Sequence, residues 1–221
     1  MTTIKQFIGC LIILFVIIYT FVDNLIMSLG VAKQKRSLDR VDKILDSAHD
    51  FLEDNMPDDI SIAKISNLAQ LKRTSTYKFF PHPNNIKEAL CQRYFEECLL
   101  SLEKSEINND QIHACIKMIL SQFYNYFENN IAAQKIVFHN NFSPTFNNEQ
   151  LKEIGNVILK KIEGANSLPQ MFNKEGVFLV IVNIVLSIFS LNIKENKELN
   201  EIGLNEAIRA SYAYYLSCAT K

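Results

Sequence analysis

Apolar side chains recur at helical spacing along most of this 221-residue chain, and no segment sustains the alternation of apolar and polar residues that a strand requires. The pattern is clearest in a predicted helix over Leu38–Asp54, for which Ser37 is the predicted N-cap. One face of this helix carries apolar side chains and the other carries carboxylates: Val41, Ile44, Leu45, Ala48, Phe51 and Leu52 against Asp39, Asp42, Asp46, Asp50 and Glu53. Such a carboxylate stripe indicates a solvated helix face rather than a metal site. The sequence therefore predicts an all-α fold.

Asparagine, glycine and proline residues divide the rest of the chain into further helices. Pro81 and Pro83 end one of them, because proline lacks an N–H donor and disfavours helix in the residue before it. The predicted ranges are about Ser61–Ala69, Arg73–Phe79, Asn84–Lys104, Asn109–Asn130, Ala132–Phe138, Asn148–Lys161, Lys174–Leu191 and Asn205–Thr220. We divide the chain into a hydrophobic segment over 1–32, a helix-turn-helix domain over 33–84 and a helical domain over 85–221.

The overall composition is that of an ordinary globular protein, with 48% hydrophobic and 21% charged residues and a net charge of −1. The five cysteines form no C-x-x-C pair and have no histidine at zinc spacing, so we expect reduced thiols and no metal site: Cys10, Cys91, Cys98, Cys115 and Cys218. No nucleophile–base pair, glycine-rich phosphate loop or H-E-x-x-H motif is present. We therefore expect neither an enzyme nor a cofactor.

The N-terminal segment contains a run of sixteen residues, Phe7–Val22, in which the thiol of Cys10 and the phenol of Tyr19 are the only ionisable groups. A membrane-spanning helix needs about 20 apolar residues, which the run reaches by continuing to about residue 29. Three interpretations stay open. The segment is a transmembrane helix over about 7–29 that holds the protein at the inner face of the cytoplasmic membrane, or a secretory signal peptide, or the product of a misassigned start. In the last case Met27 begins the chain with a short basic arm.

Local charge is uneven in spite of the neutral total, because residues 60–87 contain five basic residues and no acid: Lys64, Lys72, Arg73, Lys78 and Lys87. The first four lie on or beside two short helices joined by a tight turn, which is the arrangement of a helix-turn-helix. The second helix of such a motif enters the DNA major groove. The alternatives are that the basic residues form a solvated face and that the aromatic residues Tyr77, Phe79 and Phe80 pack in the core. The spacing together with the exclusion of acids favours DNA binding.

The segment ISIAKISNLAQLKRTSTYKFFP, with RVDKILDSAHDFLEDN before it, resembles the N-terminal domain of TetR-family transcriptional regulators. The motif-level similarity covers about residues 36–104. The matching positions are Arg40, Ile44, Leu45, Ala48, Ser61, Ile65, Ala69, Leu71, Ser75, Tyr77 and Phe80. The resemblance implies a three-helix DNA-binding domain followed by a helical domain that binds an effector and dimerises.

Three positions depart from the family pattern. Gln70 stands where the family usually has the glycine of the turn, so a non-glycine residue is expected to adopt a positive φ. Lys72 replaces the usual serine cap, which weakens the helix N-terminus but adds a phosphate contact. Pro83 replaces a lysine that commonly touches the DNA backbone, and Lys87 is expected to substitute for it one turn later.

The resemblance also implies which residues contact DNA. A basic arm that includes Lys33 is expected near phosphates, and Arg73 is the candidate for direct readout because arginine can hold guanine with two hydrogen bonds. The predicted DNA-binding residues are Lys35, Arg36, Ser61, Lys72, Arg73, Thr74, Ser75, Tyr77, Lys78 and Lys87.

The segment Gly176–Leu191 is apolar on all sides except for Asn183 and two serines, so it is either deeply buried or in lipid. A second membrane span is one interpretation. The other is a four-helix bundle formed with the last helix across a two-fold axis, which would place two recognition helices one DNA turn apart on a palindromic operator. The predicted interface residues are Phe178, Val182, Val185, Phe189, Ile208, Tyr212 and Tyr215.

Aromatic residues crowd the middle of the C-terminal half, where they form either a core or a pocket for a small hydrophobic effector. The predicted pocket residues are His113, Phe123, Tyr124, Phe127, Phe138 and Phe172, with His139 as a further polar group. We therefore expect a homodimeric, ligand-responsive transcriptional repressor that binds double-stranded DNA in the cytoplasm. The alternative is a membrane-anchored helical interaction protein with a vestigial helix-turn-helix.

Overall fold

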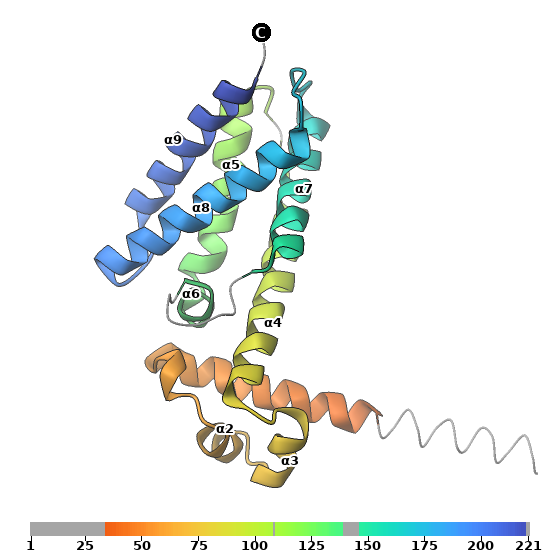
Figure 1. Ribbon diagram of the computed structural model, residues 1–221, viewed down its shortest axis with the longest axis vertical. Helices are drawn as coiled ribbons and strands as arrows, with labels where there is room; N and C mark the ends of the chain where they lie inside the picture. The colour runs from red at the N-terminus through yellow and green to blue at the C-terminus, as the bar shows by residue number, and fades with distance from the viewer. Residues whose placement is uncertain (1–33, 108, 139–145, 220–221) are drawn as a thin grey trace, which may run out of the picture. The chain divides into compact units, whose positions relative to one another are not determined.

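The computed structural model describes residues 34–107, 109–138 and 146–219, and the regular structure of these residues is helical throughout (Figure 1). The predicted all-α class is confirmed. The hydrophobic segment 1–32, with the predicted transmembrane helix over about 7–29 and the possible start at Met27, lies outside the described residues, as do Cys10, Lys33 and His139.

The first helix extends over residues 34–54 and divides its two faces as the sequence predicts. Its apolar face is buried at Ile44, Leu45, Ala48 and Leu52, whereas the five carboxylates of the opposite face are exposed. The helix is already formed at residue 34, so Ser37 lies inside it and the predicted N-cap is wrong. Chain contacts define two compact units, residues 1–44 and 45–221, and their boundary falls within this helix.

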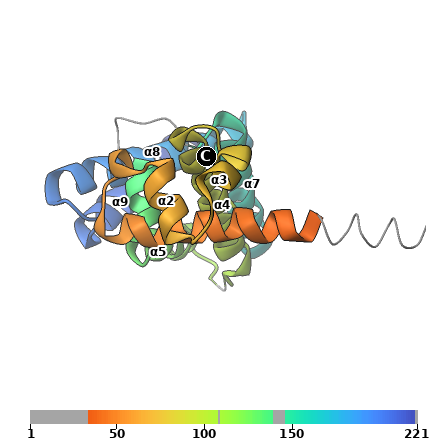
Figure 2. The same cartoon turned by 90° about the horizontal axis from the view of Figure 1, so that it is seen from below.

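A helix-turn-helix follows the short 3₁₀ helix η1 (Pro57–Asp59). Helix α2 covers Ile62–Leu68 and helix α3 covers Arg73–Phe79, close to the predicted ranges. The two helices pack on each other, and Figure 2 shows the pair from below. Ser61 is the N-cap of α2, since its side chain accepts a hydrogen bond from the backbone N–H of Lys64 at 3.2 Å.

Helix α4 (Pro83–Lys104) begins one residue earlier than predicted, because proline is well suited to the first helical position. It is tied to the first helix by two side-chain contacts. His49 Nδ1 lies 3.0 Å from the hydroxyl of Tyr94, which is fully buried, and Arg93 pairs with Asp46 at 2.6 Å. Burial raises the pKa of Tyr94, so its hydroxyl stays neutral. Further along, α4 packs on the C-terminal helices.

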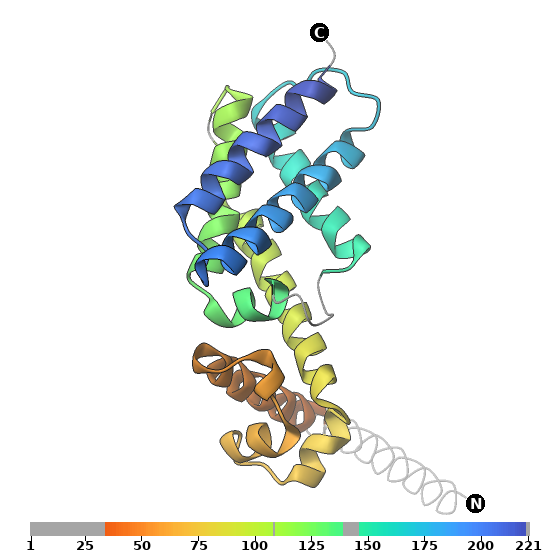
Figure 3. The same ribbon diagram turned by 60° about the vertical axis from the view of Figure 1, so that its left-hand side comes forward.

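The C-terminal helices are α5 (Ile112–Glu128), α6 (Ile131–Phe138), α7 (Asn148–Ala165), α8 (Lys174–Asn196) and α9 (Glu201–Cys218). Each corresponds to a predicted helix, with ends that differ by a few residues. Helix α8 packs against α7 on one side and α9 on the other (Figure 3). Of the four described cysteines, Cys91, Cys98 and Cys115 are buried, and none of the four forms a disulfide.

Within the described part of the chain, α8 is the one helix long and apolar enough to cross a membrane, with a mean hydropathy of 2.4 over its most apolar stretch. A core helix of a globular protein has the same length and composition. Phe178, Val182 and Phe189 are almost completely buried within the chain, whereas 39% of the apolar stretch is buried overall. The inward face of α8 therefore packs as in a core helix, and the second membrane span stays a prediction.

The turn between α2 and α3 closes as a Schellman motif. The N–H of Leu71 donates to Ser66 O at 2.9 Å, and the N–H of Gln70 donates to Asn67 O at 3.1 Å. Gln70 has a φ of 53°, so the predicted positive φ at a non-glycine residue is confirmed. A side chain in this left-handed region costs about 1–2 kcal/mol relative to the right-handed one.

We predict that Gln70→Gly raises the free energy of unfolding by about 0.5–1 kcal/mol, because glycine adopts positive φ without the steric cost. Urea unfolding followed by circular dichroism measures the change. As a control, Lys152→Gly places glycine in the exposed interior of α7, where we expect a loss of about 1 kcal/mol. A destabilised Gln70→Gly variant would contradict the motif.

Candidate nucleic-acid interface

Two buried hydroxyl groups hold α3 against α2. Ser66 Oγ donates to Ile62 O at 2.6 Å and lies 2.8 Å from Thr76 Oγ1, within hydrogen-bonding distance. Both side chains are completely buried. Because buried polar groups are costly unless they are hydrogen-bonded, this contact fixes the rotation of α3 about its own axis. Ser75 and Phe79 are half-buried, and the other residues of α3 besides Thr76 are exposed.

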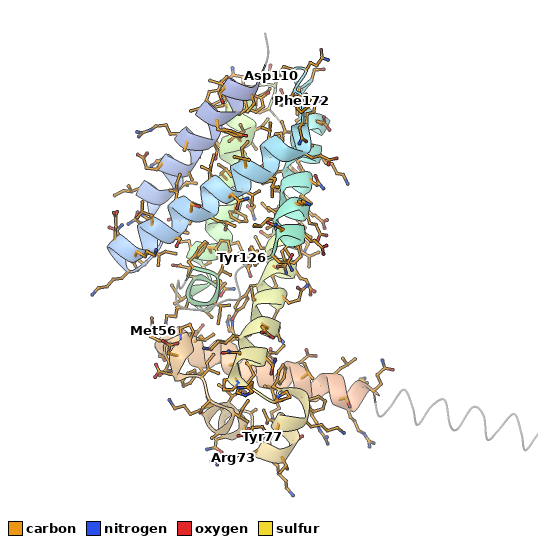
Figure 4. The ribbon with its side chains drawn as sticks, viewed as in Figure 1. Met56, Arg73, Tyr77, Asp110, Tyr126 and Phe172 are labelled. Carbon is orange, nitrogen blue, oxygen red and sulfur yellow. The ribbon has the colours of Figure 1, made fainter. Side chains whose placement is uncertain are left out.

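The outward face of α3 is basic and polar. Arg73 and Tyr77 are one turn apart, as are Thr74 and Lys78, and all four are exposed together with Lys72. Figure 4 labels Arg73 and Tyr77 on this helix, and the side chain of Tyr77 is 52% exposed. As expected, Lys72 provides no side-chain cap for α3. Its ammonium group therefore adds to the positive charge of this face, which we call the α3 face (Lys72, Arg73, Thr74, Tyr77 and Lys78).

Two of the five basic residues in this region do not join the α3 face. Lys87 is only 4% exposed and lies 4.0 Å from Asp58, so the prediction that it contacts phosphate in place of Pro83 is wrong. Burial lowers the pKa of Lys87, while the nearby Asp58 carboxylate raises it to a smaller extent. Lys64 donates to Asp59 O at 3.1 Å and lies over the ring of Phe51. The α3 face therefore carries three of the five basic residues, Lys72, Arg73 and Lys78.

The other predicted DNA contacts lie in different settings. Ser61 is half-buried and its hydroxyl oxygen caps α2, so any bond to phosphate would use its hydroxyl hydrogen. Lys35 and Arg36 are exposed on the first helix, within the separate unit 1–44.

Helix α6 contacts the end of the first helix through a single ammonium group. Lys135 Nζ donates to the carbonyl oxygens of Leu52, Glu53 and Asn55 at 2.7, 2.8 and 3.2 Å. The last carbonyl groups of a helix lack intrahelical partners and carry a partial negative charge, so a cation placed there is stabilising. A second lysine does the same for α4, since Lys161 Nζ donates to Glu103 O and Ser105 O, each at 2.6 Å.

The predicted effector pocket is a filled aromatic core. Ring centroids lie 5.3 Å apart for Phe123 and Phe127 and 4.8 Å apart for Phe127 and Phe138, and Phe123 also stacks on Phe189. Phe172 is fully exposed, so the prediction that it lines a pocket is wrong (Figure 4).

The predicted polar residues of the pocket lie elsewhere. His113 lies in an open groove between α5 and α9, with its ring against Tyr212 at 4.6 Å between centroids. Tyr124 borders a separate hollow and donates to Glu128 at 2.6 Å. The two residues therefore do not share one site.

Most residues predicted for the dimer interface pack inside a single chain. Phe178, Val182, Val185, Phe189, Ile208 and Tyr215 are each at most 6% exposed, and Tyr212 is half-buried. They form the inward faces of α8 and α9, so they are not available to a partner. The outward faces carry a different apolar set, with Val180 38%, Leu191 55%, Ile202 65% and Leu216 53% exposed.

Comparison with solved structures identifies the fold. A TetR-family transcriptional regulator from Streptomyces coelicolor superimposes with a TM-score of 0.66 at 19% identity, covering 82% of this chain and 98% of the other. The chain has the TetR-family fold. A TetR regulator from Rhodococcus sp. RHA1 gives a TM-score of 0.59 at 8% identity, with 82% and 98% covered. The TetR-family repressor AlkX from Dietzia sp. gives 0.53 at 14% identity, with 80% and 93% covered. No protein-family model and no curated protein matches this sequence.

The sequence pattern predicts the helix-turn-helix of this TetR-family fold but not the contacts that hold it. In the sequence, Thr76 looks like any other polar residue of the recognition helix. In the structure, its hydroxyl faces inward. Ser66 and Thr76 are ten residues apart, so only the turn geometry brings them together. Lys135 is 80 to 83 residues from its three acceptors, and no local pattern connects them.

We predict that Lys135→Met lowers the free energy of unfolding by about 1–3 kcal/mol, because three carbonyl groups lose a charged donor while the side-chain length is kept. Urea unfolding measures the loss, and hydrogen exchange should quicken in the last turn of the first helix. Lys160→Met, at an exposed position of α7, serves as the control and should change stability by less than about 0.5 kcal/mol. Equal effects of the two variants would contradict the role of Lys135.

Proposed function

We propose that this chain is a DNA-binding transcriptional regulator that contacts the major groove through the α3 face. The observation that carries the proposal is an exposed, acid-free cationic helix whose rotation is fixed by the buried Ser66–Thr76 contact. Arg73, at the start of α3, is suited to hold a guanine with two hydrogen bonds. Lys72, Thr74, Ser75, Tyr77 and Lys78 supply phosphate or further base contacts, with Ser61 and the exposed Lys35 and Arg36 as additional phosphate contacts.

Homodimerisation is part of the proposal. Helix α8 carries an outward apolar line at helical spacing, namely Val180, Ile184, Ile188 and Leu191. Exposed apolar area of this kind is typical of protein interfaces. Two copies related by a two-fold axis would bury it and present two α3 faces to the half-sites of a palindromic operator.

The proposed regulator responds to a small molecule and represses transcription in the cytoplasm. AlkX, which shares the fold, is described as a repressor implicated in the biodegradation of n-alkanes. An effector that binds the free conformation better than the DNA-bound one would shift the population away from DNA. Helix α6 is placed to take part, since it carries both Phe138 of the aromatic core and Lys135 at the end of the first helix.

The alternative, an interaction protein with a vestigial helix-turn-helix, rested on the departures at Gln70 and Pro83. Gln70 closes a complete Schellman motif, and Pro83 occupies the first position of α4. Both residues are therefore compatible with an intact motif, and the DNA-binding function is favoured. Attachment to the membrane through residues 7–29 stays a prediction.

We predict that Arg73→Ala weakens binding to a duplex selected from random sequences by about tenfold or more, because a two-bond base contact is lost. Lys72→Ala should weaken binding to all duplexes because one phosphate contact is lost. The salt slope, which is the steepness with which the logarithm of the binding constant falls with the logarithm of salt concentration, should drop by about 1. Fluorescence anisotropy over a series of salt concentrations measures both effects.

Lys87→Met is the matched control, since Lys87 is a basic residue of the same region that is buried away from the α3 face. Its affinity and salt slope should match those of the unmodified chain. If Lys72→Ala and Arg73→Ala bind as well as the control, the α3 face is not the DNA-binding surface.

We predict that Ile184→Glu converts the dimer to a monomer, because the two-fold axis would bring two unpaired carboxylates into an apolar interface. Sedimentation velocity measures the change in mass. Leu100→Glu replaces an exposed leucine of α4, 51% exposed and outside the proposed interface, and should leave the mass unchanged. A monomeric unmodified chain at micromolar concentration, or a dimeric Ile184→Glu variant, would refute the proposed interface.

A further inference from the structure

Phe123, Phe127 and Phe138 of the predicted pocket pack on one another in the core, and the surface of the C-terminal helices offers a groove. This groove, about 380 Å³ in volume, lies between α6, α7 and α8. Its volume falls within the range of about 300–1,000 Å³ typical of small-molecule sites. Its floor is apolar and nearly closed to solvent, since Val137, Phe138, Phe146 and Leu151 are each at most 8% exposed.

Helix α8 provides the other wall of the groove, and its polar side chains lie along one line of the helix. Asn183, Ser187, Ser190 and Lys194 recur at intervals of four, three and four residues, so they form one stripe. The stripe is about 16 Å long at 1.5 Å per residue. Leu186 and Leu191 lie beside it and complete the apolar lining. The groove is therefore an apolar trough with a polar edge that ends in an ammonium group.

The charge of the groove restricts its ligand. Lys194 is the single ionisable residue among the ten that line it, and within the described ranges it forms no ion pair. The two other hollows described above differ. The groove between α5 and α9 holds two cations, Lys117 and Arg209, of which Arg209 is paired with Glu206 at 3.0 Å, and its lining is more open. The hollow beside Tyr124 is lined by Glu128, Glu198 and Glu201. A buried apolar floor and one unpaired cation occur together at the α6–α7–α8 groove.

We propose that the α6–α7–α8 groove binds a monoanionic amphiphile, an aliphatic carboxylate whose tail lies on Phe138 and Phe146 and whose carboxylate pairs with Lys194. Apolar contact with the floor supplies binding energy in proportion to the buried area, and the ammonium group selects an anionic head group. The inference names the effector class of the proposed regulator and so rests on that function.

A ligand in the groove contacts α6, and α6 also contacts the end of the first helix. Val137 and Phe138 form part of the groove floor, and Lys135 on the same short helix holds the carbonyl groups of Leu52, Glu53 and Asn55. A ligand tail that displaces Phe138 moves α6 and with it the ammonium group. The last turn of the first helix then loses its support, and this turn directly follows His49, whose ring lies 3.0 Å from the hydroxyl of Tyr94.

Binding of dodecanoate to the full chain, below its micelle-forming concentration and without DNA, tests the proposal by isothermal titration calorimetry. We expect saturable binding that Lys194→Ala weakens by about tenfold or more, as for the loss of a charge-assisted hydrogen bond. The neutral 1-dodecanol should bind Lys194→Ala and the unmodified chain equally. Lys160→Ala, an exposed lysine of α7 outside the groove, should leave dodecanoate binding unchanged.

Ser187→Trp is the second variant, because position 187 is exposed and a large ring there fills the groove without disturbing the core. It should abolish binding of both ligands while thermal unfolding stays cooperative. Absence of saturable dodecanoate binding, or equal binding by Lys194→Ala and Lys160→Ala, overturns the proposal.

Anisotropy with the selected duplex separates this proposal from the proposed function. Dodecanoate should release the duplex from the unmodified chain but not from Ser187→Trp. If the duplex binds and dodecanoate does not, the effector class is wrong and DNA binding stands. If dodecanoate binds at Lys194 and the chain binds no duplex, the groove stands and the regulatory function is wrong.

Discussion

The ammonium group of Lys135 closes the end of the first helix, and the arrangement of the neighbouring elements depends on that contact. A helix of this length ends with four carbonyl groups that need partners, and no glycine follows to provide a Schellman cap. Lys135 supplies the missing donors from a helix more than 80 residues later in the chain. The neighbouring Gln134 is also fixed, because its side-chain amide donates to Phe127 O and accepts from the N–H of Leu199. Helix α6 thus connects α5, the α8–α9 junction and the first helix through two consecutive side chains.

The helix-turn-helix is likewise held by a small number of contacts. Ser66 and Thr76 set the rotation of α3, the Schellman turn sets its direction, and α4 joins the first helix through Tyr94 and His49. These contacts use hydroxyl, imidazole and main-chain groups on the inner side. The cationic groups of α3 are therefore left for a partner. The same division explains the neutral net charge of the chain, since the exposed carboxylates of the first helix offset the basic residues that follow.

Much of the fold follows from local pattern. Helical spacing and the proline pair at 81 and 83 place the first four helices, and the positive φ of Gln70 follows from the resemblance to the turn of the TetR family. The dimer residues could not be predicted in the same way, because α8 is apolar on all sides and its periodicity does not tell the inward face from the outward one. The sequence pattern therefore predicts that Phe178 and Phe189 contact a partner, whereas in the structure both side chains fill the core. Lys87 shows a similar ambiguity, because a basic residue near the α3 face can equally be buried against Asp58.

The central claim is that the chain contacts DNA through α3. Hydrogen–deuterium exchange of the full chain, with and without the selected duplex, tests it most directly because every backbone segment is observed at once. If α3 contacts DNA, hydrogen exchange in residues 61–80 slows on DNA binding and exchange in α7 does not change. Unchanged exchange in residues 61–80, or slower exchange only in α5–α9, would contradict DNA contact through α3.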